Sequence, residues 1–139
     1  MTHRFVATVA YGWHDSFPPG VYVPLAGLAE SDAEEDFALE FQGGVGEPDG
    51  QDIRLGMDSY CVVTPAQNTA YGCLRTVEFE GDLLRLTFDP AHLDDLGLDD
   101  PVFEAVLQAP AEKVARMKEA LQRVLGYGRT DALPVVTGF

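Results

Sequence analysis

Few groups of residues in this sequence have the types and spacing that catalysis or metal binding requires. His14, Asp15 and Ser16 are the residue types of a hydrolytic triad, but consecutive side chains project in different directions, whereas a triad needs them to converge. We interpret this segment as a turn. The aspartate pairs at 94–95 and 99–100 are typical of solvated turn and cap residues. The sequence therefore predicts no catalytic residue, no metal site and no cofactor.

The two cysteines lie on neighbouring strands of a predicted hairpin. Strands over 57–64 and 70–80, joined by a loop at 65–69, place Cys61 opposite Cys73. In that register the thiols could form a disulfide or share a metal ion, although two sulfurs are only half of a structural zinc site. We interpret them as small reduced core residues, and their pairing stays open. An enzyme that uses the Cys73 thiol together with His14 or His92 is a further hypothesis.

The chain is strongly acidic, with 23 Asp and Glu against nine Lys and Arg and a net charge of −14. Proteins that bind nucleic acid or an anionic membrane need a basic surface, so both are disfavoured as direct partners. The acidic surface either attracts a partner with a basic surface, because clustered carboxylates speed such an encounter, or serves solubility alone. The longest uncharged run, 59–74, is too short to span a membrane. Two cysteines, and an N-terminal apolar stretch too short for a signal peptide, predict a cytoplasmic protein.

Short alternating segments separated by turn residues dominate the first three-quarters of the chain. Within 36–42, Phe37, Leu39 and Phe41 share one face of a predicted strand, and the residues between them are mostly polar. The segment 43–51 is rich in glycine and acids and is predicted to be an exposed loop. The predicted strands cover 5–10, 21–28, 36–42, 57–64, 70–80, 83–88 and 99–107.

Helix signals occur late in the chain. Asp89 followed by Pro90 is a typical helix start and Gly97 a typical stop, so a short helix is expected between them. In 110–125, apolar residues at offsets 0, 3, 7, 10 and 11 predict a long amphipathic helix that ends at Gly126.

The elements together predict the α+β class. We expect an antiparallel β-sheet of about six or seven strands, with one long C-terminal amphipathic helix and one short helix. Residues 1–126 form a single domain in this interpretation. Residues 127–139 form a tail that is either an edge strand or disordered.

Residues between positions 51 and 60 form a distinctive pattern. It consists of Gln51, Asp52, Leu55, Gly56, Met57, Asp58, Ser59 and Tyr60, and further matching segments are Leu39 to Gln42, Tyr71-Gly72, Leu84-Arg85-Leu86 and Leu96-Gly97-Leu98. The pattern resembles the bacterial immunity protein 10 family, and the resemblance runs over residues 20–125. Ser59 stands where the family usually has threonine, and Cys73 replaces the second glycine of the hairpin.

The resemblance implies a function that the composition does not show. Such proteins are encoded beside a polymorphic toxin, bind the catalytic domain of that toxin and block it without chemistry of their own. Many of these toxins are nucleases with basic clefts, which an acidic inhibitor would complement. We expect the partner contacts to come from six residues near the central pattern: Glu47, Asp49, Asp52, Asp58, Tyr60 and Tyr71.

An alternative function stays open beside this one. The chain could be a small ligand-sensing or scaffold domain that self-associates through a sheet edge. Val135 and Val136 in the tail are candidates for that edge. A homodimer is compatible with the sequence.

Overall fold

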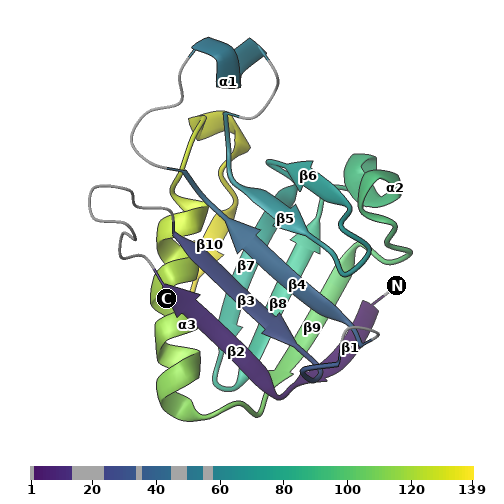
Figure 1. The fold of residues 1–139 in the computed structure, drawn as a ribbon, viewed down its shortest axis with the longest axis vertical. Coiled ribbons are helices and arrows are strands. Elements are labelled where there is room, and N and C mark those ends of the chain that lie inside the picture. Colours follow the sequence, from purple (N-terminus) through teal and green to yellow (C-terminus); the bar gives the residue numbers. More distant parts are fainter. Residues whose placement is uncertain (1, 14–23, 34–35, 45–49, 55–57) are drawn as a thin grey trace.

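The computed structural model describes residues 2–13, 24–33, 36–44, 50–54 and 58–139, and the strands in this part of the chain form two five-stranded sheets (Figure 1). Sheet A contains, in spatial order, β1 (Thr2–Ala7), β9 (Val102–Leu107), β8 (Leu83–Phe88), β7 (Leu74–Glu80) and β10 (Val135–Thr137). Sheet B contains β2 (Val9–Trp13), β3 (Leu25–Ala29), β4 (Ala38–Gln42), β5 (Cys61–Val63) and β6 (Thr69–Tyr71). The helices are α1 (Gly50–Arg54), α2 (Leu93–Leu96) and α3 (Ala111–Leu125), with 3-10 turns η1 (Pro90–His92) and η2 (Thr130–Ala132).

The inner faces of the two sheets and α3 enclose one hydrophobic core. Leu84, Leu86 and Phe88 point inward from β8, and Leu39 and Phe41 point inward from β4. The alternation follows from the two-residue period of a strand, which sends every second side chain to the same face. In Figure 1, sheet B lies in front of sheet A. Each sheet therefore turns its other face outward.

Helix α3 packs against the inner face of sheet B at β2 and β3. Its buried apolar stripe includes Met117, Ala120 and Leu121. A Cβ atom on Gly12 of β2 would lie only 2.6 Å from the carbonyl oxygen of Arg116 and 2.8 Å from the Cβ of Ala120. The helix can therefore approach this strand so closely only because residue 12 is glycine.

The α+β class and several local elements are confirmed. The predicted strand over 83–88 is β8, and the predicted long helix over 110–125 is α3, which begins one residue later. The carboxylate of Asp89 accepts a hydrogen bond from the amide of Ala91 at 3.0 Å, and Gly97 ends α2 with a φ of 70°. These boundaries depend on local capping, which sequence patterns describe well.

The prediction of a single antiparallel sheet is wrong. The predicted strands over 5–10 and 70–80 are each divided between the two sheets. Thr8 separates β1 from β2, and the break between β6 and β7 contains Gly72, whose φ is +60°. At each break the chain crosses from one sheet to the other. In addition, β1 pairs with β9, and β10 with β7, in parallel.

The predicted register of the β5–β6 hairpin is also wrong. Cys61 pairs with Tyr71 rather than with Cys73. The amide of Thr64 donates to the carbonyl of Asn68 at 2.9 Å, so the turn is tighter than the predicted five-residue loop. Cys73 instead lies at the crossing into sheet A, and both cysteines are free and buried.

Two other segments differ in detail from the sequence analysis. Gly50 and Gln51, expected in an exposed loop, begin α1, while 45–49 lies outside the described residues. The tail contains η2 and β10, and the ring of Phe139 packs edge-on against Phe79 with 4.7 Å between centroids. β10 is the edge strand of sheet A beside β7.

Candidate binding face on sheet B

The outer face of sheet B is built from one side chain per strand in register. Tyr11 of β2 stands beside Gly27 of β3, which is followed by Glu40 of β4, Val63 of β5 and Thr69 of β6. The neighbours of these residues along each strand, such as Ala10 and Ala26, point into the core. The row therefore follows from strand alternation and from the pairing of five consecutive strands.

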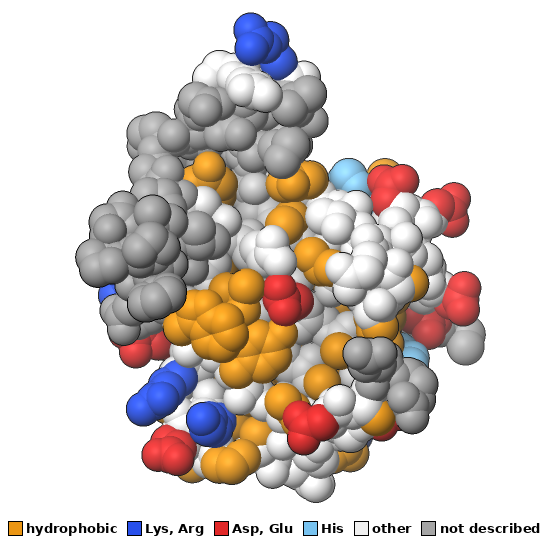
Figure 2. Space-filling view, viewed as in Figure 1, with side chains coloured by type: hydrophobic (Ala, Val, Ile, Leu, Met, Phe, Trp, Pro, Cys, Tyr) orange, Lys and Arg blue, Asp and Glu red, His pale blue; other side chains and the backbone are white. Residues whose placement is uncertain are grey.

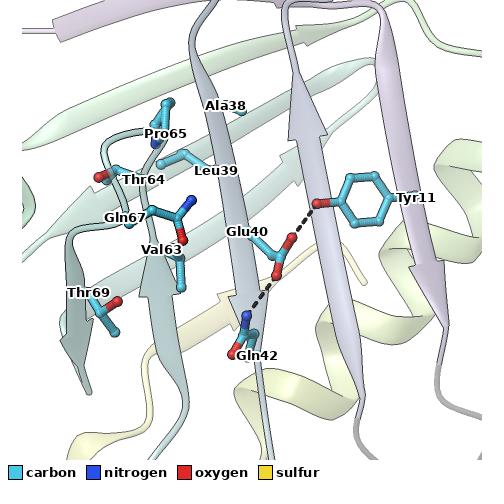
Figure 3. Close-up of a pocket in the computed structure, with 10 residues that line it drawn as sticks. All are labelled: Tyr11, Ala38, Leu39, Glu40, Gln42, Val63, Thr64, Pro65, Gln67 and Thr69. Atoms are coloured by element: carbon cyan, nitrogen blue, oxygen red, sulfur yellow. Dashed lines mark hydrogen bonds between the residues drawn. The ribbon is translucent and has the colours of Figure 1, made fainter. Parts of the chain in front are cut away.

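Gly27 forms a notch in this face. A Cβ atom at position 27 would overlap the ring of Tyr11, so the tyrosine lies across β3 over the glycine backbone. In that position the Tyr11 hydroxyl donates a hydrogen bond of 2.7 Å to Oε2 of Glu40 (Figure 3). Burial and then this hydrogen bond raise the pKa of Tyr11 well above its usual value, so the phenol keeps the proton that it donates.

Glu40 is the centre of a short polar network. Its Oε1 accepts a hydrogen bond of 2.7 Å from Nε2 of Gln42, and Oε1 of Gln42 accepts a long contact of 3.8 Å from the thiol of Cys61. No ion pair joins Glu40 to a lysine or arginine among the described residues. The carboxylate is thus fixed by two neutral donors, and its negative charge is not paired within the described part of the chain.

An aromatic pair borders the carboxylate. The ring of Trp13 stacks on that of Tyr11, with 5.5 Å between centroids and 28° between the ring planes. Trp13 is the only tryptophan of the sequence and is 53% exposed. Figure 2 shows a hydrophobic patch on this side of the molecule with an acidic side chain next to it. Large aromatic side chains beside a fixed polar group are typical of binding surfaces.

A shallow hollow of about 460 Å³ continues from the carboxylate toward β6. Its walls include Glu40 and Tyr11 on one side and Gln67, Thr64 and Thr69 on the other (Figure 3). The second wall supplies an amide and two hydroxyl groups, which are neutral hydrogen-bonding partners. The arrangement is suited to binding a polar or cationic group, with one negative charge at its edge.

Of the six predicted contact residues, Tyr71 belongs to this face. It continues the row that runs from Trp13 through Leu25, Gln42 and Cys61 across sheet B. Glu47 and Asp49 lie outside the described residues. The backbone of Asp52 lies in α1, and its side chain is outside the described part of the structure.

Asp58 and Tyr60 are buried beneath the surface. Tyr60 is 0% exposed, and its hydroxyl accepts a bond of 3.0 Å from the amide of Leu74 and lies 3.1 Å from the carbonyl of Ala132. Asp58 is 5% exposed, and its carboxylate lies 3.5 Å from Nε of Arg129. Both side chains connect the segment 51–60 to the tail 127–139, so in this conformation they support the fold and offer almost no surface to a partner.

Sequence reasoning missed Tyr11, Trp13 and Glu40 as a group. The predicted strand over 5–10 ended before either aromatic residue, and Glu40 was identified only as part of a polar strand face. A signal was nevertheless present, because a lone tryptophan and a glycine within an apolar strand often mark a surface where another chain or ligand approaches.

The structure also bears on the thiol-enzyme hypothesis. Burial raises the pKa of Cys61 to about 11 and that of Cys73 to about 12. Buried thiols with raised pKa values are protonated at neutral pH and are poor nucleophiles. His92 faces Asp95 at 3.6 Å, and His14 lies outside the described residues. Among the described residues, no group of three or more His, Cys, Asp or Glu side chains could hold a metal ion.

Comparisons with known proteins add one match. A family model described as immunity protein 10 matches residues 7–115, which include all five strands of sheet B and the strands β7, β8 and β9. No curated protein and no solved structure matches the chain. Within the described residues, no helix is both long and apolar enough to cross a membrane.

Proposed function

The chain belongs to the immunity protein 10 family, and from that premise we propose that it binds and occludes a cognate polymorphic toxin domain. The protein acts by contact alone and catalyses no reaction. It works in the cytoplasm of the cell that makes the toxin or of its siblings. A nuclease with a basic cleft is the toxin class that its charge fits best.

The family match over most of the chain is the observation that carries this proposal. The net charge of −14 supports it, because an acidic inhibitor is attracted to a toxin site that binds an anionic substrate. The acidic segment around Glu47, Asp49 and Asp52 supplies steering charge in this proposal, and Tyr71 supplies an aromatic contact. Asp58 and Tyr60, later in the chain, fix their own backbone through Arg129 and Leu74.

Co-expression tests the proposal. The C-terminal domain of the product of the neighbouring open reading frame is expressed in a bacterial host with and without this chain, and survivors are counted. Toxicity that this chain relieves, together with copurification of the two proteins, is the expected result. Toxicity without rescue and without a complex would contradict the proposal.

The exposed edge strand β10 favours the second hypothesis, a scaffold domain that self-associates through a sheet edge. Val135 is 67% exposed and Val136 is 38% exposed at the edge of sheet A. Exposed apolar edge strands can pair with a second copy. Sedimentation of the full chain and of its Val135→Lys variant distinguishes the readings, because self-association through β10 predicts a dimer that the lysine disrupts.

A further inference from the structure

We propose that the outer face of sheet B is the docking site for an arginine side chain of the toxin. The Tyr11–Trp13 pair provides the surface on which the guanidinium stacks, and Glu40 provides the opposite charge. This inference rests on the proposed function, since it names the place and the chemistry of the toxin contact.

The negative charge of Glu40 has no cationic partner among the described residues, unlike the comparable glutamates of sheet A. Partly buried glutamates on the outer face of sheet A are paired with arginine: Glu104 with Arg4 and Arg85, and Glu78 with Arg85. Glu40 has only the neutral donors Tyr11 and Gln42 among the described residues. An ionised carboxylate has about four lone-pair positions, so each oxygen of Glu40 can accept one more hydrogen bond.

Because of the aromatic pair, an arginine side chain fits this site better than a lysine side chain. A guanidinium is planar, stacks on aromatic rings and offers a fork of donors to a carboxylate, whereas an ammonium is a compact and strongly hydrated charge. The Tyr11 ring and the Glu40 carboxylate are joined by a 2.7 Å hydrogen bond, which fixes the distance between the stacking surface and the acceptor.

The site is also preorganised. Gly27 leaves room for the Tyr11 ring against the backbone of β3, and Trp13 stacks on that ring from the next outward position of β2. Side chains that are already held in the bound geometry lose little conformational entropy when a partner docks. The hollow beside Glu40, about 460 Å³ in volume, leaves room for the backbone that carries the arginine.

Two variants and a matched control test the docking site in the full chain. Glu40→Gln removes the charge with little change of shape, and Trp13→Ala removes the exposed ring. Glu78→Gln makes the same chemical change on the outer face of sheet A, where the side chain is 41% exposed. Circular dichroism and thermal unfolding first establish that each variant is folded.

The affinity for the toxin domain of the neighbouring open reading frame is then measured by titration calorimetry. Glu40→Gln and Trp13→Ala are each expected to weaken binding by at least about tenfold, as is found for the residues that contribute most to an interface. Glu78→Gln is expected to leave the affinity unchanged. If the unaltered chain rescues cells and binds the domain, yet both sheet B variants bind as tightly as Glu78→Gln, the docking site is overturned and the proposed function stands. If the unaltered chain neither rescues nor binds, both fall together.

A second measurement tests the preference for a guanidinium directly. Fluorescence of Trp13, the only tryptophan, is followed during titration with N-acetyl-arginine amide and with N-acetyl-citrulline amide at equal ionic strength. The arginine compound is expected to change the emission more than the neutral citrulline compound, and Glu40→Gln is expected to abolish the difference. Equal responses to both compounds in the unaltered chain would contradict recognition of a cation.

Discussion

The outer faces of the two sheets differ in whether their charged side chains are paired with opposite charges. On sheet A, Arg4, Glu104, Arg85 and Glu78 stand side by side across β1, β9, β8 and β7. Each neighbour has the opposite charge, with closest N–O distances of 3.2, 2.7 and 3.8 Å along the row. On sheet B the corresponding row contains one charge, Glu40, between an aromatic ring and neutral side chains.

Strand register thus decides what a carboxylate on either sheet can still bind. Arg4 donates to Oε1 of Glu104 and Arg85 donates to Oε2, so the charge of Glu104 is satisfied within the sheet. The hydrogen bonds from Arg85 are the main reason why the pKa of Glu104 is lowered. Glu40 is also hydrogen-bonded at both oxygens, but by donors that carry no charge. The first glutamate stabilises its sheet, and the second remains available to a cation.

Among substitutions on the outer faces of the two sheets, the largest loss of stability is expected from Glu104→Gln. The substitution removes the negative charge between Arg4 and Arg85, so two guanidinium groups face each other across β9 with no carboxylate between them. The free energy of unfolding, measured by urea denaturation, should fall more than for any substitution on the outer face of sheet B. A smaller loss than for Tyr11→Phe would contradict the comparison.

The stability lost in Glu104→Gln should also depend on pH. Because the pKa of Glu104 is lower in the folded chain than its usual 4.5, its contribution to stability is present above that usual value. The contribution is lost as the pH falls through the lowered value, where the folded state is protonated. The stability difference between the unaltered chain and Glu104→Gln should therefore shrink in acid. A difference that stays constant with pH would show that charge is not its source.

Tyr11→Phe should have the next largest effect. The substitution keeps the ring over Gly27 and removes the hydrogen bond to Glu40. A hydrogen bond to a charged acceptor contributes about 1.5 kcal/mol at the low end of its range, which suits a half-buried pair. Urea denaturation followed by circular dichroism measures the loss, and an unchanged midpoint would show that water replaces the hydroxyl at no cost.

Trp13→Ala should cost less, because the ring is already half exposed. It loses the stacking on Tyr11, which is expected to contribute about 0.5–1 kcal/mol, the lower part of the 0.5–1.5 kcal/mol range of aromatic pairs. Thermal unfolding monitored by circular dichroism checks this value. A loss several times larger would indicate that Trp13 is a structural residue rather than a contact surface.

Gly27→Ala is expected to change stability little and geometry most. A strand alanine gains about 0.5–1 kcal/mol over glycine, which offsets only part of the roughly 1.5 kcal/mol of the hydrogen bond lost when the new methyl group displaces the Tyr11 ring. A shift of the Trp13 emission maximum, with a loss of urea stability smaller than that of Tyr11→Phe, is the expected result. Gly12→Ala is the matched control, because its methyl group would meet the backbone of α3 rather than a movable ring, and it should clearly destabilise the protein.

The elements that follow from local sequence could be predicted, and those that depend on distant pairing could not. The alternation that predicts β8 lies within six residues, and the apolar offsets that predict α3 lie within 15 residues. The breaks at Thr8 and Gly72 are different. Across the first break the inward positions change from Phe5 and Ala7 to Ala10, but residues 5–10 are apolar at almost every position. The pattern alone therefore cannot show that the two halves pair with different neighbours.

The candidate site likewise has one part that local sequence predicts and another that depends on distant strand pairing. The polar face that contains Glu40 and Gln42 is visible from the sequence of β4 alone. Its aromatic border comes from β2, 29 residues earlier at Tyr11, and only the register through β3 brings the two together. Tyr60 shows the opposite error, because an aromatic residue beside acidic residues indicated a surface contact although its hydroxyl is bonded in the interior.

The order of the strands also sets the order in which a nascent chain can fold. Sheet B joins β2, β3, β4, β5 and β6 in the order in which they are synthesised, so each new strand finds its partner already made. Sheet A cannot close until β9 is available to β1, whose contacts span 100 residues. At synthesis rates of about 5–20 residues per second, β1 waits roughly 5–20 s on the ribosome for that partner. The strands of the face that we assign to the toxin are therefore the first to be complete, and its inner side is covered only after the last strands and α3 have been synthesised.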